Sequence, residues 1–231
     1  MKVARFGAVF DLNGVIIKDG RLHDAAWLDV ANRNRRIKWT IDDLHLIAGR
    51  STLAVANILC PEAKDKLAVV AEKNRLYEVS LRRELLSDPD SLKIPGVCEL
   101  ISQLAEESVS LALNTSSPSS EAETILKSFG IMQHFSLVLT GEVAPNPKPH
   151  PEGYILAAQG MDLFPQQCVG FEDSLPGLRS LNSAGYGVIV AVGSILTEAQ
   201  VRASGLRIDR YIPDFSAFTL NEISGLVTSR A

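Results

Sequence analysis

Charged and hydroxyl-bearing residues follow four short apolar runs of this 231-residue sequence. An aspartate follows the first run, and two hydroxyl residues follow the second. A lysine lies in the loop after the third run, and an acidic pair follows the fourth. In chain order these residues are Asp11, Thr115, Ser116, Lys148, Glu172 and Asp173. Carboxylates, one ammonium group and hydroxyls are the groups that Mg²⁺-assisted phosphoryl transfer requires.

Each residue type has a defined use in that chemistry. A carboxylate such as Asp11 can attack phosphorus and form an acyl phosphate, which divides the transfer into two steps. Because the two reactants are both anions, a hard cation is needed between them, and Asp11 and Asp173 can supply its ligands with Glu172 nearby. Lys148 can offset the charge of the phosphoryl oxygens. Thr115 and N–H groups at the following helix start can bind those oxygens.

Each of these residues also has an ordinary structural interpretation. Asn13-Gly14 between two apolar runs is typical of a two-residue hairpin turn, which would place Asp11 beside a turn. A single lysine in a loop is usually solvated, and an acidic pair before a helix often interacts with the helix dipole. Thr115 and Ser116 are also consistent with ordinary loop and capping hydroxyls. The residue pattern leaves these alternatives open.

The apolar runs alternate with helical patterns, which is typical of a parallel sheet in an α/β protein. In such a sheet, ligands bind at the carboxyl ends of the strands, where the residues above lie. We therefore expect a doubly wound, Rossmann-like α/β core. Its strands are predicted at Phe6–Phe10, Val109–Leu113, Leu137–Leu139, Cys168–Phe171, Val188–Val190 and near Arg210–Ile212.

The stretch between about residues 18 and 88 interrupts this alternation, because its pattern is helical with no convincing strand. We expect a helical cap domain at residues 18–89, inserted into a core domain formed by residues 1–17 and 90–231. The joints are predicted near Lys18–Gly20 and Ser87–Leu92. The cap helices are predicted at Leu22–Ile37, Ile41–Ile47, Thr52–Leu59 and Ala63–Leu86.

Composition excludes several classes of function. The net charge of −4 and the absence of a basic block argue against a nucleic-acid partner. No apolar run reaches the roughly 18 residues that a membrane span needs, and the N-terminal run is too short for a signal peptide. Cys60, Cys98 and Cys168 lack disulfide or metal spacing, which favours a reducing cytoplasm.

The sequence resembles the haloacid dehalogenase superfamily, and within it the β-phosphoglucomutase-like phosphatases and mutases. The resemblance covers nearly the whole chain and four motifs in order. These are Asp11-Leu12-Asn13-Gly14-Val15, Leu113-Asn114-Thr115, Lys148-Pro149-His150-Pro151 and Gly170-Phe171-Glu172-Asp173-Ser174, with Pro95-Gly96-Val97 at the return from the cap. The resemblance implies catalytic roles for Asp11, Asn13, Thr115 and Lys148, and an Mg²⁺ site at Asp11, Asn13, Glu172 and Asp173.

The resemblance extends into the predicted cap. His23 with Ala26-Trp27 matches a family pattern, Gly49-Arg50-Ser51 fits the substrate-facing cap loop, and Lys73 matches a lysine that faces the site. His23 could also be one polar position on an amphipathic helix, and Lys73 a solvated lysine. The residues implied in substrate binding are His23, Gly49, Arg50, Ser51, Lys73, Ser116 and Ser117.

Asn13 departs from the family pattern. Phosphatases and mutases of this family have aspartate there, as the general acid and base, whereas an amide cannot exchange that proton at neutral pH. The backbone carbonyl of Asn13 can still face the metal. General acid–base catalysis is typically worth ~10²–10⁴-fold, so we expect binding to survive while turnover suffers. Lys18 similarly replaces an aspartate common in the flap.

The sequence therefore predicts an Mg²⁺-dependent phosphatase or phosphomutase that uses an aspartyl phosphate and acts on a small phosphorylated metabolite, such as a sugar phosphate. The alternative is a phosphate-ester-binding protein with little turnover. A dehalogenase is disfavoured, because such members of the superfamily need no Mg²⁺ and the Glu172-Asp173 pair would lack a purpose. We expect a cytoplasmic monomer or weak dimer with no nucleic-acid or membrane partner.

Overall fold

The chain forms two compact units in the computed structural model, which describes residues 6–33, 38–46, 52–143 and 146–230. The first unit combines Met1–Lys18 with Pro89–Ala231, and the second unit is Asp19–Asp88. The second unit is thus an insertion into the sequence of the first. Its action as a cap stays a prediction.

Over the described residues, the first unit contains a six-stranded sheet in the order β3-β2-β1-β4-β5-β6, and every pairing is parallel. This confirms the predicted α/β core. The hairpin alternative at Asn13-Gly14 is wrong, because the strand before it pairs on both sides with distant parallel strands. The strands are β1 (Gly7–Phe10), β2 (Ser110–Asn114), β3 (Leu137–Leu139), β4 (Cys168–Glu172), β5 (Val188–Val192) and β6 (Arg210–Ile212).

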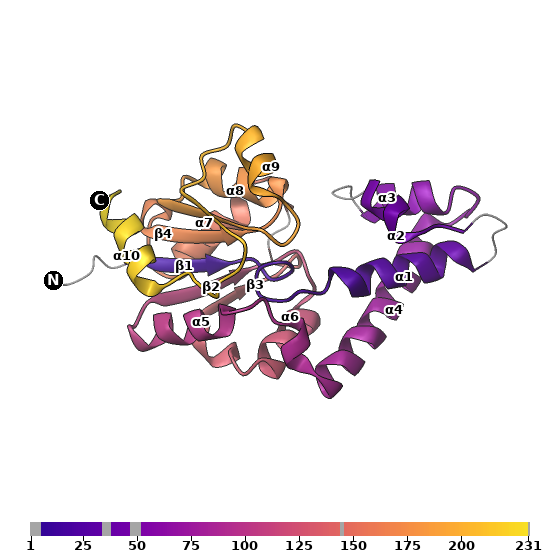
Figure 1. Cartoon of the computed structure of the whole chain (residues 1–231), viewed down its shortest axis with the longest axis horizontal. Coiled ribbons are helices and arrows are strands. Elements are labelled where there is room, and N and C mark those ends of the chain that lie inside the picture. Colours follow the sequence, from indigo (N-terminus) through magenta and orange to yellow (C-terminus); the bar gives the residue numbers. More distant parts are fainter. Residues whose placement is uncertain (1–5, 34–37, 47–51, 144–145, 231) are drawn as a thin grey trace. The chain divides into compact units, whose positions relative to one another are not determined.

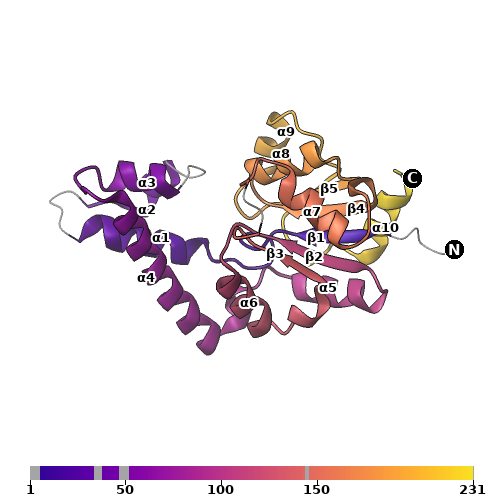
Figure 2. The ribbon, with the colours of Figure 1, turned by 180° about the vertical axis from the view of Figure 1, so that it is seen from behind.

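Helices cover both faces of this sheet, with α7 and α8 on one face and α5 on the other (Figure 1, Figure 2). Ser174 caps α8, since its side chain accepts a hydrogen bond from the Gly177 N–H. The helices are α5 (Val97–Glu106), α6 (Ser119–Ser128), α7 (Glu152–Gly160), α8 (Leu175–Ala184), α9 (Glu198–Ala203) and α10 (Leu220–Thr228).

Aromatic side chains fill the core below the carboxyl ends of the central strands. Phe10 on β1 and Phe171 on β4 stack with ring centroids 4.5 Å apart, and Phe215 packs against both rings. Phe10 and Phe171 are fully buried. Each is followed directly in sequence by an acidic residue, so this packing fixes the positions of Asp11 and Glu172.

The chain leaves the first unit and returns to it through two paired segments, residues 16–18 and 92–94. The Lys18 N–H donates to the Leu92 carbonyl at 2.6 Å, and the Ile94 N–H donates to the Ile16 carbonyl at 3.1 Å. Ile17 and Lys93 form an antiparallel bridge between them. The two connections are therefore held side by side by the first unit itself.

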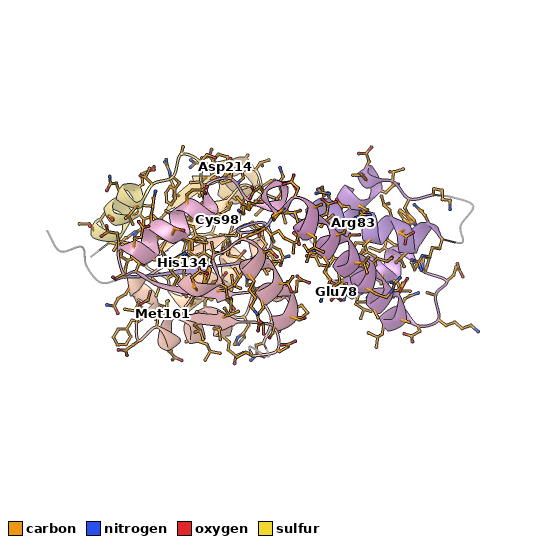
Figure 3. The ribbon with its side chains drawn as sticks, turned by 90° about the horizontal axis from the view of Figure 1, so that it is seen from below. Glu78, Arg83, Cys98, His134, Met161 and Asp214 are labelled. Carbon is orange, nitrogen blue, oxygen red and sulfur yellow. The ribbon has the colours of Figure 1, made fainter. Side chains whose placement is uncertain are left out.

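The second unit is helical over its described residues, as predicted. A hydrophobic cluster that includes Trp27, Val55 and Leu59 joins its helices. Its longest helix buries one stripe, Lys73, Tyr77, Leu81 and Leu85, whereas Glu78 and Arg83 are exposed to solvent (Figure 3). None of the described helices is long and apolar enough to cross a bilayer. The helices are α1 (Gly20–Asn32), α2 (Ile41–Leu46), α3 (Thr52–Leu59) and α4 (Lys66–Ser87).

Phe171→Ala should lower the free energy of unfolding by about 3–5 kcal/mol, because it removes a fully buried ring from the core that positions Glu172. Phe164→Ala is the matched control, since it removes the same atoms from a side chain that is 73% exposed, and it should change stability by less than ~0.5 kcal/mol. Urea denaturation followed by circular dichroism measures both. Equal losses would show that the aromatic cluster does not stabilise the core.

Candidate active site

The carboxyl ends of neighbouring strands bring the predicted site residues of the first unit together. Asp11 directly follows β1, and its N–H donates to the Phe171 carbonyl of β4 at 3.1 Å. Thr115 directly follows β2, and its N–H donates to the Leu139 carbonyl of β3 at 2.9 Å. Both positions are therefore fixed by hydrogen bonds to adjacent strands.

Lys148 lies between two carboxylates. Its Nζ is 2.5 Å from Asp11 Oδ1, 2.6 Å from Glu172 Oε1 and 3.1 Å from the Asn114 carbonyl oxygen. Burial lowers the pKa of Lys148, but the charges and hydrogen bonds of Asp11 and Glu172 outweigh it, so the net pKa is raised and the ammonium group stays charged. The alternative that Lys148 is a solvated loop lysine is wrong.

Glu172 is fully buried, and both of its oxygens are occupied by donors. Oε1 accepts from Lys148 and from the Tyr154 hydroxyl at 2.8 Å. Oε2 accepts from the N–H groups of Asp173 and Ser174 and from the Ser174 hydroxyl. Through these hydrogen bonds, Glu172 orients Lys148 and the start of α8.

Asp173 has the opposite environment. Among the side chains that the structure describes, its Oδ2 is a buried oxygen without a hydrogen-bond partner. Burial, followed by the charges of Glu172 and Asp11, raises the pKa of Asp173 well above its ordinary value. Burial also raises the pKa of Asp11 to about 7, with a lowering contribution from Lys148 and a raising one from Glu172. Lys148 therefore offsets only part of the cost of ionising Asp11, and Asp173 Oδ2 has no donor among the described residues.

A divalent cation would balance the negative charge of these carboxylates. Asp11, Glu172 and Asp173 each offer an oxygen, and these oxygens lie within 4.8 Å of one another. If all three carboxyl groups were ionised, they and the one lysine would leave a net charge of −2 in a buried site, which is costly without a counterion. Oxygen ligands of this kind suit a hard cation. The unpartnered oxygen of Asp173 is the specific observation that favours a metal here.

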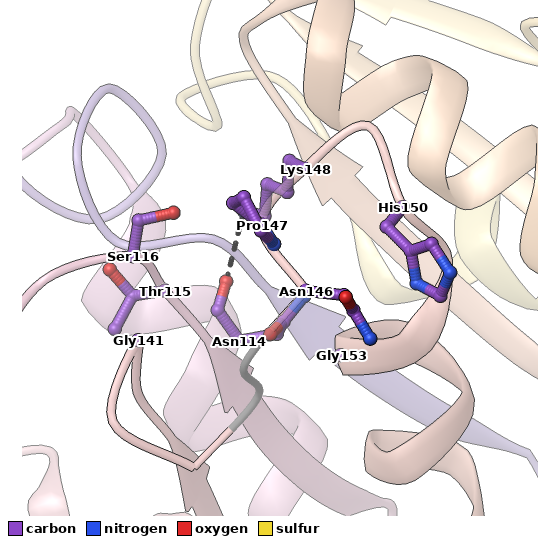
Figure 4. Close-up of a pocket in the computed structure, with 9 residues that line it drawn as sticks. All are labelled: Asn114, Thr115, Ser116, Gly141, Asn146, Pro147, Lys148, His150 and Gly153. Atoms are coloured by element: carbon purple, nitrogen blue, oxygen red, sulfur yellow. Dashed lines mark hydrogen bonds between the residues drawn. The ribbon is translucent and has the colours of Figure 1, made fainter. Parts of the chain in front are cut away.

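A pocket of about 220 Å³ opens beside Lys148. Thr115 and Ser116 line it from the loop after β2, and His150 lines it from the loop that carries Lys148 (Figure 4). Gly141 also lines it, and a Cβ there would come within 2.8 Å of the Ser116 carbonyl oxygen. The predicted hydroxyls and the lysine thus share one cavity that can admit a small polar ligand.

Asn13 contacts a hydroxyl from the loop after β2. The Ser117 Oγ lies 3.0 Å from Asn13 Oδ1, and the Ser117 N–H donates to Thr115 Oγ1 at 3.0 Å. The same Ser117 Oγ lies 2.6 Å from Glu121 Oε1, in the first turn of α6. No feature of the sequence identifies Glu121 as a residue of the site.

Two predicted substrate-binding residues of the second unit belong to one polar cluster. Lys73 is only 5% exposed, its Nζ lies 2.6 Å from His23 Nδ1, and it sits over the rings of Trp27 and Tyr77. The Tyr77 hydroxyl donates to Asp19 at 2.6 Å. The alternative that Lys73 is a solvated lysine is therefore wrong, although substrate binding by His23 and Lys73 stays a prediction. Gly49, Arg50 and Ser51 lie outside the described residues.

Two further groups of site residues could not be identified from the sequence. Tyr154 bonds Glu172, yet a tyrosine six residues after Lys148 carries no specific signal. Gly14 and Gly177 provide space, because a Cβ would lie 1.8 Å from Asp173 Oδ2 in the first case and 1.9 Å from Glu172 in the second. Gly14 also has a φ of +78°, which disfavours other residues.

Comparison with known proteins gives the family. Residues 7–185 match the sequence model of the haloacid dehalogenase-like hydrolases. A phosphorylated carbohydrates phosphatase of Thermotoga maritima is 32% identical over 83% of this chain and 89% of that protein. A β-phosphoglucomutase of Bacillus subtilis is 26% identical over 77% of this chain and 79% of that protein.

A solved structure supports the same relationship at the level of the fold. The HAD hydrolase of family IA, variant 3, from Entamoeba histolytica matches with a TM-score of 0.83 at 23% identity, over 96% of this chain and 99% of that chain. The family match spans most of the sequence, and the motifs that carry it lie together at the carboxyl ends of β1, β2 and β4. The chain therefore belongs to the haloacid dehalogenase-like hydrolases, with a phosphatase and a β-phosphoglucomutase among its relatives.

Proposed function

We propose that this chain is an Mg²⁺-dependent enzyme that transfers the phosphoryl group of a small phosphorylated metabolite, of the sugar-phosphate class, through an aspartyl phosphate on Asp11. The observation that carries the proposal is the buried pairing of Asp11 with Lys148 beside Asp173, whose Oδ2 has no partner among the described residues. The sugar-phosphate class is supported by the names of the two relatives, a phosphorylated carbohydrates phosphatase and a β-phosphoglucomutase.

The residues of the site have complementary roles in this proposal. Asp11 attacks phosphorus with an oxygen whose position is set by its backbone bond to β4. Lys148 holds that carboxylate and offsets charge on the phosphoryl oxygens. Thr115 and Ser116, with N–H groups of the same loop, bind the phosphoryl group in the pocket beside Lys148. Glu172 keeps Lys148 in place.

Asp11 and Asp173 would hold Mg²⁺, together with the backbone carbonyl of Asn13. When bound, the ion supplies positive charge that stabilises the phosphoryl oxygens. Whether water or a sugar hydroxyl accepts the phosphoryl group distinguishes a phosphatase from a phosphomutase, and both belong to this proposal. A cytoplasmic location and a monomeric or weakly dimeric state stay predictions from the sequence.

Asn13 favours a second candidate function, a phosphate-ester-binding protein with little turnover. An amide at this position cannot donate a proton to the leaving oxygen or accept one from water. The two functions are separated by assaying phosphate release from a panel of sugar phosphates, with and without Mg²⁺. An enzyme releases phosphate only with Mg²⁺, and the Asp11→Asn variant provides the blank.

Asp173→Asn should weaken Mg²⁺ binding by more than ~10-fold, because it removes an anionic ligand of the ion. A loss of ~10-fold is typical for a residue that contacts a metal ligand but not the metal itself. Asp11→Asn should do the same. Asp162→Asn is the matched control, since Asp162 is an exposed aspartate at φ +56°, a conformation that asparagine also adopts. Isothermal titration calorimetry with Mg²⁺ measures all three. Unchanged affinity in both site variants would place the metal elsewhere.

Mg²⁺ affinity should increase with pH through about 7, the raised pKa of Asp11. Below that pH the carboxyl group holds a proton and is no ligand, whereas above it the carboxylate is free to bind. Titrations at about pH 6 and about pH 8 in buffers of different ionisation enthalpy should show proton release at the lower pH. Equal affinity without proton release at both pH values would contradict the assignment of Asp11.

Asn13→Asp should raise kcat by roughly 10²-fold, because it supplies a titrating carboxyl group beside the transferring phosphoryl group. KM should change much less, since the two side chains have nearly the same size. Steady-state kinetics with Mg²⁺ and the best substrate of the panel measure the effect. If neither the variant nor the unsubstituted protein releases more phosphate than Asp11→Asn, more than one catalytic group is missing, and the result supports the binding function.

A further inference from the structure

Ser117 connects Asn13 to the carboxyl group of Glu121. Its Oγ is 3.0 Å from Asn13 Oδ1 and 2.6 Å from Glu121 Oε1. Resting on the proposed phosphoryl transfer, we propose that Glu121 holds the proton that the Asn13 amide cannot exchange, and that the Ser117 hydroxyl passes this proton to and from the reacting oxygen. Glu121 therefore acts through Ser117 and does not itself touch the substrate.

Two positions of the proton are compatible with the contacts at Ser117. A serine hydroxyl carries one hydrogen, so it cannot donate to both Asn13 Oδ1 and an ionised Glu121. Both contacts are satisfied when Glu121 is protonated, donates to Ser117 and leaves the hydroxyl hydrogen for Asn13. With Glu121 ionised, the hydroxyl donates to Glu121 instead. The short separations at Ser117 thus accommodate the acid form and the base form of Glu121.

The surroundings keep this arrangement in place. The Ser117 N–H donates to Thr115 Oγ1, and the neighbouring Ser116 lines the pocket beside Lys148. Glu121 is fixed in the first turn of α6, where its own N–H donates to the Pro118 carbonyl. The hydroxyl is therefore held between the pocket loop and the helix, next to the position where the family has its acid and base.

The proposed proton transfers balance over both steps. In the first, Asp11 attacks phosphorus and the bond to the alcohol oxygen breaks; that oxygen takes the Ser117 proton while Ser117 takes the proton of Glu121. In the second, water attacks phosphorus and the bond to Asp11 breaks; the water proton passes to Ser117, and the Ser117 proton returns to Glu121. The net reaction is hydrolysis of the ester to an alcohol and phosphate.

The test is a cycle of four proteins: the unsubstituted chain, Glu121→Gln, Asn13→Asp and the double variant. Glutamine keeps an oxygen that accepts from Ser117 but has no exchangeable acid proton. Glu121→Gln should lower kcat of the unsubstituted chain by roughly tenfold at unchanged KM, and should lower kcat by less than about twofold in the Asn13→Asp background, where a carboxyl group is restored.

The matched control is Glu123→Gln, on the same helix, because the Glu123 carboxylate bonds Lys127 instead of the site. It should leave kcat unchanged in both backgrounds. Equal losses from Glu121→Gln in both backgrounds would assign Glu121 a structural role and overturn the proposal. No loss in an active unsubstituted chain would overturn it as well.

The Asp11→Asn variant, which lacks the proposed nucleophile, distinguishes failure of this inference from failure of the proposed function. Suppose that Asn13→Asp releases phosphate but the unsubstituted chain releases no more phosphate than Asp11→Asn. In that case no proton passes through Ser117, and this inference fails while the proposed function stands. If no protein of the cycle exceeds the blank on any sugar phosphate with Mg²⁺, the proposed function fails and the inference with it. Thermal unfolding of each variant verifies that it is folded.

Discussion

The ion pairs of Lys148 with Asp11 and Glu172 are the constraint on which the active site depends. Removing either carboxylate would leave a buried ammonium group partly uncompensated, and removing the lysine would leave two buried carboxylates facing each other. Such a site forms only if the backbones that carry these groups are held at fixed positions. The parallel pairing of β1 with β4, and the stacking of Phe10 on Phe171 beneath them, provide that fixation.

Much of this arrangement could be predicted from the sequence because it follows from local patterns. Apolar runs of about five residues marked the strands, and the rule that parallel sheets bind ligands at their carboxyl ends placed Asp11, Thr115 and Asp173 at one edge. The hairpin at Asn13-Gly14 could not be excluded in the same way, because a local turn signal does not reveal which distant strands will pair.

Side-chain environments were harder to predict, because they depend on residues distant in sequence. Lys73 and Lys148 have no local feature that distinguishes them from solvated lysines, yet aromatic rings enclose one and carboxylates enclose the other. Tyr154 and Glu121 were missed for the same reason. Their contacts arise only after α7 and α6 pack into the first unit, and the sequence period shows which face of a helix is buried but not which atom it meets.

The paired segments 16–18 and 92–94 have a consequence for how this architecture diversifies. Their hydrogen bonds hold the two ends of the insertion together within the first unit. Because these bonds already fix the end-to-end distance, inserts of different length and shape can be exchanged at this junction with little added closure entropy. A change in the length or shape of the insertion should therefore leave the positions of the residues at the sheet edge undisturbed.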